Sequence, residues 1–291
     1  RGLGISHARN LFRETLPAAV IGFGGYPTVP PLLAGRLSGV PFAIHDANAV
    51  MGRANRLLAP FTSAIALSFE KTKYVPARYG GKTRVVGMPV RDSVKAAAKP
   101  YPKRSTADRF SLLVFGGSQG ARVFADIVPG ALAGLPQALR ARLRLVQQVR
   151  EEDMERVRAA YSDARIDAEL APFFPDLPKR MADAHLVIGR AGASTVAELT
   201  VLGRPAILVP LPHALDNDQL ENATRVHDAG GAWCIGQAEF TSERLRDELV
   251  AMASKPETLE RAAEAARSLG EPDAVSRRAD VVEELMRGRS A

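Results

Sequence analysis

The chain has 291 residues, of which 46% are hydrophobic and 24% are charged, and its formal net charge is +7. These values are typical of a globular protein long enough for two domains. The single cysteine, Cys234, excludes a disulfide framework, and no stretch reaches the roughly 18–20 apolar residues of a membrane span. The positive charge favours an anionic partner, such as nucleic acid, an acidic membrane surface or a phosphorylated substrate, although solubilising surface charge explains it as well.

Short apolar strands alternate with amphipathic helices almost throughout, which predicts βαβ units and parallel sheets. The chain opens on Arg1 inside a helix-like pattern, and we expect an N-terminal piece to be absent. The predicted strands are residues 18–23, 41–45, 63–68, 111–115, 142–148, 166–170, 186–188 and 206–209, with a further short strand at Trp233 and Cys234. The predicted helices include residues 151–161, 194–202 and 218–229 and a C-terminal run, 256–287, that breaks near Gly270 and Pro272.

The most polar, proline-bearing stretch, residues 95–108, is the predicted interdomain linker. It separates an N-terminal domain, residues 1–94, from a C-terminal domain, residues 109–270, which a helix at 271–291 follows. The predicted fold class is α/β, with two doubly wound parallel-sheet domains facing each other across a cleft. Such domains bind ligands at the carboxyl ends of their strands.

A glycine-rich turn follows the strand at 111–115 and leads into a helix, as in loops that bind phosphate. Gly116, Gly117 and Gly120 let the backbone turn sharply and approach a ligand, while Ser118 and Gln119 offer side-chain hydrogen bonds. The motif is neither a Walker A loop nor a G-x-G-x-x-G fingerprint. A tight turn without a ligand explains these residues about as well.

A second helix start, at Gly192 and Ala193, also lies at a strand end. Ser194 can cap this helix, and Glu198 falls on the same face, where a carboxylate could accept hydrogen bonds from a ribose diol. An ordinary first-turn glutamate favoured by the helix dipole is the competing interpretation.

Other polar residues near strand ends carry weaker signals. Gln219 could bond sugar hydroxyls and Arg91 a diphosphate, but capping and surface roles explain them equally. His213 lies in a proline-bounded loop and is expected to be solvated. No cluster has the spacing of metal ligands, and no Gly-x-Ser-x-Gly elbow occurs.

Taken together, the ordered motifs resemble the MurG family, GT-B-fold transferases that add N-acetylglucosamine to lipid I in peptidoglycan synthesis. The resemblance covers nearly the whole chain. It rests on Gly-Phe-Gly-Gly-Tyr-Pro from Gly22, the His45–Asn48 strand end, Pro-Val-Arg ending at Arg91, Gly-Gly-Ser-Gln-Gly-Ala from Gly116, Gly-Ala-Ser-Thr-Val-Ala-Glu from Gly192, and Asp218-Gln219 followed by Asn222-Ala223.

The resemblance implies roles for individual residues. Ser118 and Gln119 match the diphosphate loop of the family, Arg91 a donor-contacting arginine, and Glu198 the carboxylate that binds ribose. Phe174 falls where backbone contacts to uracil are expected, Gln219 matches a sugar-hydroxyl contact, and Asn48 a contact from the N-terminal domain. The predicted substrate-binding residues are therefore Asn48, Arg91, Ser118, Gln119, Phe174, Ser194, Glu198 and Gln219.

The implied reaction is inverting: the muramyl C4 hydroxyl attacks the anomeric carbon of UDP-GlcNAc, UDP leaves, and no metal or cofactor is required. The catalytic base is expected in the absent N-terminal loop, with His45 as a fallback. The usual His-Glu-Gln-Asn is here His45-Asp46-Ala47-Asn48, the usual Gly-Asn-Pro-Val-Arg has Met88, and Asn217 stands where relatives tend to have Gln.

The implied partners are UDP-GlcNAc, lipid I, an anionic membrane surface and other cell-wall synthesis proteins, with peripheral localisation on the cytoplasmic face of the bacterial inner membrane. Residues 6–13 and 51–61 interleave Arg with Leu and Phe, which suits an anionic lipid surface unless Leu11, Phe12, Leu57 and Leu58 are core. The alternatives are a related lipid glycosyltransferase, a sugar-nucleotide epimerase and a chain that binds the donor without transferring it. A nucleic-acid binder ranks lowest, because no recognition motif is present.

Overall fold

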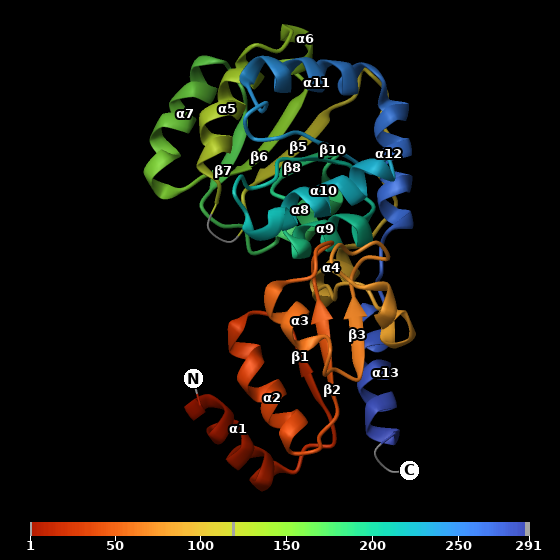
Figure 1. The fold of residues 1–291 in the computed structure, drawn as a ribbon. Helices are drawn as coiled ribbons and strands as arrows, with labels where there is room; N and C mark the ends of the chain where they lie inside the picture. Colours follow the sequence, from red (N-terminus) through yellow and green to blue (C-terminus); the bar gives the residue numbers. More distant parts are fainter. Residues whose placement is uncertain (1, 118–119, 289–291) are drawn as a thin grey trace. The chain divides into compact units, whose positions relative to one another are not determined.

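The computed structural model describes residues 2–117 and 120–288 (Figure 1). Contacts divide the chain into two units. Unit 1 contains the residues up to Val90, Leu215–Glu221 and the residues from Glu271 onward. Unit 2 contains Arg91–Ala214 and Asn222–Gly270. The predicted domain bounds stay a prediction. The contact division differs from them at residues 91–94, which cluster with unit 2, and at Leu215–Glu221, which cluster with unit 1.

Unit 1 is built on a four-stranded parallel sheet in the order β1-β2-β3-β4. Its strands are β1 (Val20–Gly22), β2 (Phe42–Asp46), β3 (Ala64–Leu67) and β4 (Thr83–Val85). Its helices are α1 (Gly2–Thr15), α2 (Val29–Leu37), α3 (Arg53–Leu58) and α13 (Ala274–Arg287), with short 3-10 turns at Tyr26–Thr28 and Ala77–Lys82.

The two faces of this sheet are covered by different parts of the chain (Figure 1). Because side chains alternate along a strand, Phe42 and Ile44 of β2 pack on one face, with Leu32 of α2 and Leu58 of α3. Ala43 of β2 lies on the other face, in a small cluster with Val281 of α13. The C-terminal helix α13 is therefore an integral layer of unit 1.

Unit 2 has a six-stranded parallel sheet in the order β10-β9-β8-β5-β6-β7. The order reverses beside β5, which pairs with β6 on one side and with β8 on the other. The strands are β5 (Phe110–Phe115), β6 (Leu143–Gln148), β7 (Ala168–Ala171), β8 (Leu186–Gly189), β9 (Ala206–Leu208) and β10 (Ala232–Cys234). Ligands bind at such a reversal in open α/β sheets.

Helices cover this sheet on both faces, and a large apolar cluster packs alternate residues of its strands, such as Leu112 and Val114 of β5, against helices on one face. The helices are α4 (Asp92–Ala97), α5 (Arg122–Ala133), α6 (Gln137–Arg140), α7 (Met154–Asp163), α8 (Leu177–Asp183), α9 (Ala193–Leu202), α10 (Asp218–Asp228), α11 (Ser242–Ser254) and α12 (Pro256–Ser268), with a 3-10 turn at Glu151–Asp153. The 3-10 turn at Leu215–Asn217 and the first residues of α10, up to Glu221, cluster with unit 1. Each predicted strand overlaps an observed one. The pattern missed β4, because its sequence Thr-Arg-Val contains no apolar run.

The segment that follows α4 is fixed to unit 2 by hydrogen bonds. Arg204 is fully buried, and its NH2 group donates to Lys99 O at 3.3 Å and Pro100 O at 3.2 Å. The same guanidinium donates to the carbonyls of Ala182 and Leu202, at the ends of α8 and α9. Tyr101 adds a hydrogen bond from its hydroxyl to His185 O at 2.9 Å. Arg204 thus satisfies helix-end carbonyls that no helical N–H can reach.

Burial and positive charge keep His185 neutral. Its Nδ1 accepts a hydrogen bond from Ser111 N at 2.9 Å, which only an unprotonated nitrogen can do. The pKa of His185 is lowered from 6.5 to about 4, first because the ring is buried and then because Arg104 and Arg204 are positively charged.

We expect the free energy of unfolding of unit 2 to fall as the pH is lowered from 6.5 to about 4. In this window the unfolded chain protonates His185 and the folded chain does not, so protons favour unfolding. One such histidine changes the free energy by up to about 1.4 kcal/mol per pH unit. Urea titrations followed by the fluorescence of Trp233, the single tryptophan, measure it. His185→Gln should flatten the slope and exposed His7→Gln should not; equal slopes in both variants would contradict the assignment.

Candidate active site

The loop after β5 lies at the reversal of the unit 2 sheet. Gly116 N donates to Gln148 Oε1 at 3.0 Å, which joins this loop to the end of β6. Gly117 and Gly120 have φ values of 85° and 67°, in the left-handed region that favours glycine. Arg150 donates to Gly120 O at 3.3 Å. Ser118 and Gln119, both predicted to bind substrate, lie outside the described residues.

Gly116 cannot carry a side chain in this loop. A Cβ there would lie 2.1 Å from Ala121 N and 2.5 Å from Gly120 C, both backbone atoms. We expect Gly116→Ala to lower the free energy of unfolding by about 2–3 kcal/mol, because the loop must rearrange. Gly192→Ala is the matched control, since a Cβ there meets nothing within 4 Å. Urea unfolding compares the two; similar losses would show that the loop does not need its glycine.

Arg91 and Glu198, predicted separately, meet in unit 2. Arg91 precedes α4, and Glu198 lies in α9 after β8. The guanidinium donates to Glu198 Oε1 from Nε at 3.2 Å and from NH2 at 3.0 Å. The Glu198 residue is only 8% exposed, and burial raises the pKa of its carboxyl while Arg91 opposes that rise. Both hydrogen bonds use Oε1, so among the described residues Oε2 remains available to a ligand hydroxyl.

The predicted capping role of Ser194 is wrong. Gly192 is the N-cap of α9 with no side-chain cap bond, and the helix begins at Ala193. Ser194 is therefore inside the first turn and exposed to solvent, two residues after the capping position. Its prediction as a substrate-binding residue does not depend on capping and stays a prediction.

The sequence analysis did not identify as site residues two polar residues that join loops at the strand ends of unit 2. Arg190 donates to Val209 O at 3.0 Å and to Gln237 Oε1 at 2.6 Å, so it joins the loops after β8, β9 and β10. Asn222 is fully buried and donates to Ala191 O at 3.1 Å. An arginine directly after a buried strand was a usable signal. The contact of Asn222 needed the tertiary fold.

Phe174 and Gln219 lie in different units of the chain. Phe174 follows β7, is buried, and has the Arg180 guanidinium 4.4 Å from its ring centroid. Gln219 belongs by contact to unit 1, and its backbone N–H donates to Asp218 Oδ1 at 2.7 Å. Their proposed contacts to uracil and sugar stay predictions.

His45 and Asp46 end strand β2 in unit 1 and are both buried. His45 Nε2 lies 3.3 Å from both Gly87 O and Ser68 Oγ. Burial, followed by the charge of Arg278, lowers the pKa of His45 from 6.5 to about 4. The imidazole is thus neutral near pH 7 and its Nε2 is already engaged.

The Asp46 carboxylate organises the loop that carries Asn48. It accepts hydrogen bonds from Gly52 N at 2.7 Å, Asn48 N at 3.3 Å and Asn55 Nδ2 at 2.9 Å. Burial raises the pKa of Asp46, and these three donors oppose that rise. The shorter aspartate, where the resemblance expects glutamate, is therefore built into this loop. Nothing in the sequence identified Asn55.

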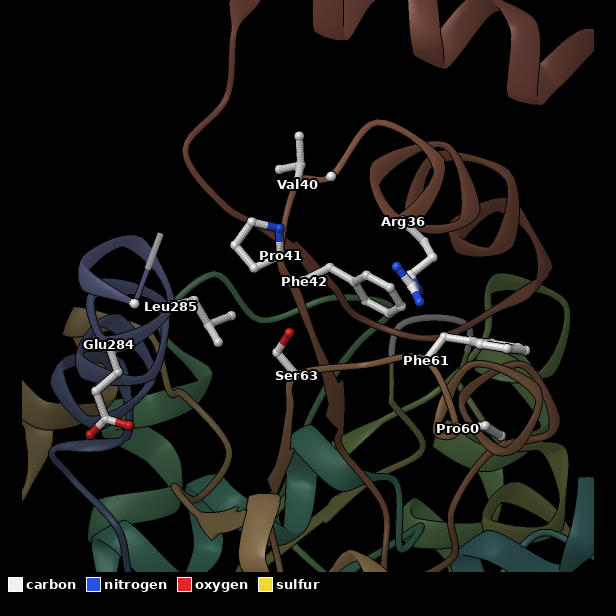
Figure 2. Close-up of a pocket in the computed structure, with 11 residues that line it drawn as sticks. Arg36, Val40, Pro41, Phe42, Pro60, Phe61, Ser63, Glu284 and Leu285 are labelled. Atoms are coloured by element: carbon white, nitrogen blue, oxygen red, sulfur yellow. The ribbon is translucent and has the colours of Figure 1, made fainter. Parts of the chain in front are cut away.

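Two pockets lie at opposite edges of unit 1. A pocket of about 220 Å³ is lined by Asn48 and by Gly25 and Tyr26 from the loop after β1. A larger pocket, of about 530 Å³, lies at the amino ends of β2 and β3. Figure 2 shows it between Arg36 and Phe61 on one side and Glu284 and Leu285 of α13 on the other. It contains no predicted site residue, so the pocket with Asn48 is the candidate ligand site of this unit.

Among residues 2–117 and 120–288, no group of three or more His, Cys, Asp or Glu side chains could hold a metal ion. In the same ranges, no helix combines the length and the apolar character needed to cross a membrane.

Two family models match this chain. The Glycosyltransferase family 28 C-terminal domain matches residues 111–282, and the Glycosyltransferase family 28 N-terminal domain matches residues 1–67. The chain belongs to glycosyltransferase family 28. The predicted resemblance and the predicted fold class, with two parallel-sheet α/β domains, are both confirmed.

Named relatives and solved structures are similar to this chain. A UDP-N-acetylglucosamine–N-acetylmuramyl-(pentapeptide) pyrophosphoryl-undecaprenol N-acetylglucosamine transferase from Bradyrhizobium sp. strain BTAi1 is 56% identical over 97% of this chain and 77% of its own length. MurG of Acinetobacter baumannii superposes with a TM-score of 0.81 at 30% identity, covering 96% of this chain and 78% of that one. A protein named as a putative UDP-N-acetylglucosamine 2-epimerase from Listeria monocytogenes has a TM-score of 0.70 over 94% of this chain and 76% of its own, but at 15% identity it shares the fold alone.

Proposed function

We propose that this chain transfers N-acetylglucosamine from UDP-GlcNAc to N-acetylmuramyl-(pentapeptide) pyrophosphoryl-undecaprenol, the lipid I of peptidoglycan synthesis. The observation that carries the proposal is the 56% identity over 97% of the chain to a transferase named for this reaction. The Arg91–Glu198 pair and the glycine loop after β5 supply groups suited to such a donor.

Unit 2 is the proposed donor-binding unit. Glu198 Oε2 would accept hydrogen bonds from the ribose hydroxyls, and Arg91 and the loop backbone would face the diphosphate. As the muramyl C4 hydroxyl attacks the anomeric carbon, its proton passes to a general base, the bond to UDP breaks and negative charge grows on the leaving diphosphate. Fixed N–H donors and a guanidinium stabilise that charge more than they stabilise the bound donor.

We propose a positioning role for His45 in place of the fallback role of base. Its buried Nε2 joins the end of β2 to Ser68, which follows β3, and to Gly87. A nitrogen with these neighbours and a pKa near 4 is a poor acceptor for a substrate proton at neutral pH.

The test is product formation by the full chain with UDP-GlcNAc and a short-chain lipid I analogue, alongside calorimetric titration with UDP-GlcNAc and UDP-glucose. We expect a disaccharide product, stoichiometric UDP, and binding that prefers the N-acetyl sugar. Donor binding without product would identify a donor-binding chain that does not transfer. Conversion of UDP-GlcNAc without acceptor would identify an epimerase.

We also propose that the chain works as a peripheral protein at the cytoplasmic face of the bacterial inner membrane. Leu11 of α1, Leu57 of α3 and Phe61 are 54%, 56% and 48% exposed, whereas Leu58 is core. α1 and α3 both pack against α2, so the helices that carry Leu11 and Leu57 belong to one layer of unit 1, and Phe61 follows α3. The test is binding to vesicles that contain phosphatidylglycerol. We expect the wild type to bind and the double variant Leu57→Ser, Phe61→Ser to lose binding. Equal binding to neutral vesicles would exclude an anionic preference.

A further inference from the structure

One cation in unit 1 lies beside the carboxyl edge of its sheet. Strand periodicity places Phe23, His45 and Ser68, at the ends of β1, β2 and β3, on the face that α13 covers. On α13, Arg278 lies one turn before Val281, which packs on that face. Its guanidinium carbon is 4.9 Å from the centroid of the Phe23 ring, which in turn lies 6.0 Å from the His45 ring.

No carboxylate of the described residues pairs with this guanidinium. Arg278 Nε is shielded from solvent and has no hydrogen-bond partner among them. The neighbouring Arg277, by contrast, forms an ion pair with Glu271 at 2.7 Å. Placing a cation in a partly buried site without a counter-ion destabilises the fold, unless a ligand supplies the negative charge.

The geometry defines the class of that ligand. One face of the guanidinium lies over an aromatic ring, which leaves its N–H edge to form paired hydrogen bonds with an oxyanion. Gly24 and Gly25 follow Phe23 with φ values of 81° and 77°, a conformation that lets the backbone approach a ligand closely. The site therefore suits a phosphoryl or carboxylate group.

We propose that Arg278 binds an oxyanion of the acceptor substrate and so contributes to acceptor recognition. This inference rests on the proposed function. The acceptor carries such groups in its pyrophosphate and in its peptide carboxylates, and both present the same chemistry to the guanidinium.

The test compares Arg278→Met with Arg277→Met, a matched change at the next position of α13. In Arg278→Met we expect the KM for the lipid I analogue to rise about tenfold, the loss typical of one charge-assisted contact, and the KM for UDP-GlcNAc to stay unchanged. Its Tm should stay equal or rise, because an unpaired cation is removed. Arg277→Met should alter neither KM.

Other outcomes decide against the inference or locate the oxyanion. An unchanged acceptor KM, or a lower Tm with both KM values raised, would overturn it. With an acceptor that lacks the peptide, a persisting effect assigns the contact to pyrophosphate and a vanished effect assigns it to the peptide carboxylates.

A second readout does not depend on transfer. In the presence of saturating UDP, wild-type protein should bind inorganic pyrophosphate about tenfold more tightly than Arg278→Met. Equal binding by both proteins would overturn the anion site even if the wild type proves to be an active transferase. Weaker binding by the variant would support the site even if the wild type makes no product.

Discussion

Replacing Glu198 by alanine is expected to lower kcat/KM for UDP-GlcNAc about a hundredfold. The proposed ribose contact is a charge-assisted hydrogen bond to a buried carboxylate, and such contacts contribute about 1.5–3 kcal/mol each. The variant also removes the carboxylate that accepts hydrogen bonds from Nε and NH2 of Arg91. Steady-state kinetics with varied donor, together with donor titration by calorimetry, measure the loss.

Glu169→Ala is the matched control, because this carboxylate also pairs with an arginine of unit 2, Arg180, at 2.8 Å but is about half exposed. It should leave donor kinetics unchanged. A double-mutant cycle with Arg91→Met separates the two roles, since partners in one network are not additive. If Glu198→Ala binds UDP-GlcNAc as the wild type does, Glu198 only holds Arg91 in place.

Replacing Arg204 by methionine is expected to lower the free energy of unfolding of unit 2 by about 3–5 kcal/mol. The side chain is 0% exposed and donates to the carbonyls of Ala182, Leu202, Gly203, Lys99 and Pro100. Methionine fills much of the same volume but donates nothing, so these carbonyls lose the hydrogen bonds from Arg204. Among the described residues, only Lys99 O and Leu202 O keep a further donor, the NH2 group of Arg267. Urea unfolding followed by Trp233 fluorescence gives the change.

Arg144→Met is the control for Arg204, because Arg144 is exposed on β6. Its expected effect is within about 0.5 kcal/mol. Comparable losses in the two variants would mean that removal of positive charge, and not loss of the buried donors, destabilises unit 2.

Local sequence pattern was sufficient for the architecture. Apolar runs bounded by glycine and proline located the strands, and their alternation with helices predicted parallel pairing, which the registers of β1 with β2 and β5 with β8 show. It also placed Arg91 and Glu198 near strand ends. The break near Gly270 and Pro272 separates α12 from α13 as expected.

The features that the sequence pattern did not predict depend on contacts between residues far apart in the chain. The polar composition of residues 95–108 predicts a linker. The residue that fixes this stretch to unit 2, Arg204, lies over a hundred residues later in the chain, so the local composition does not indicate the contact. The roles of Asn55 and Arg278 likewise depend on their contacts with residues at strand ends, which form only in the folded chain. No periodicity signals such a contact, because the side chain meets its partner only after the sheet has formed.

The position of α13 in unit 1 affects the order in which the two units can fold during synthesis. A ribosome releases the strands of unit 1 first, then all of unit 2, and only afterwards the helix that covers Ala43 and Ala66. During translation, one face of the unit 1 sheet therefore stays exposed until α13 has been synthesised, whereas unit 2 can already fold. Its small alanine side chains present little apolar surface during that interval. Unit 2 is thus expected to protect itself from proteases on the nascent chain earlier than the unit that precedes it.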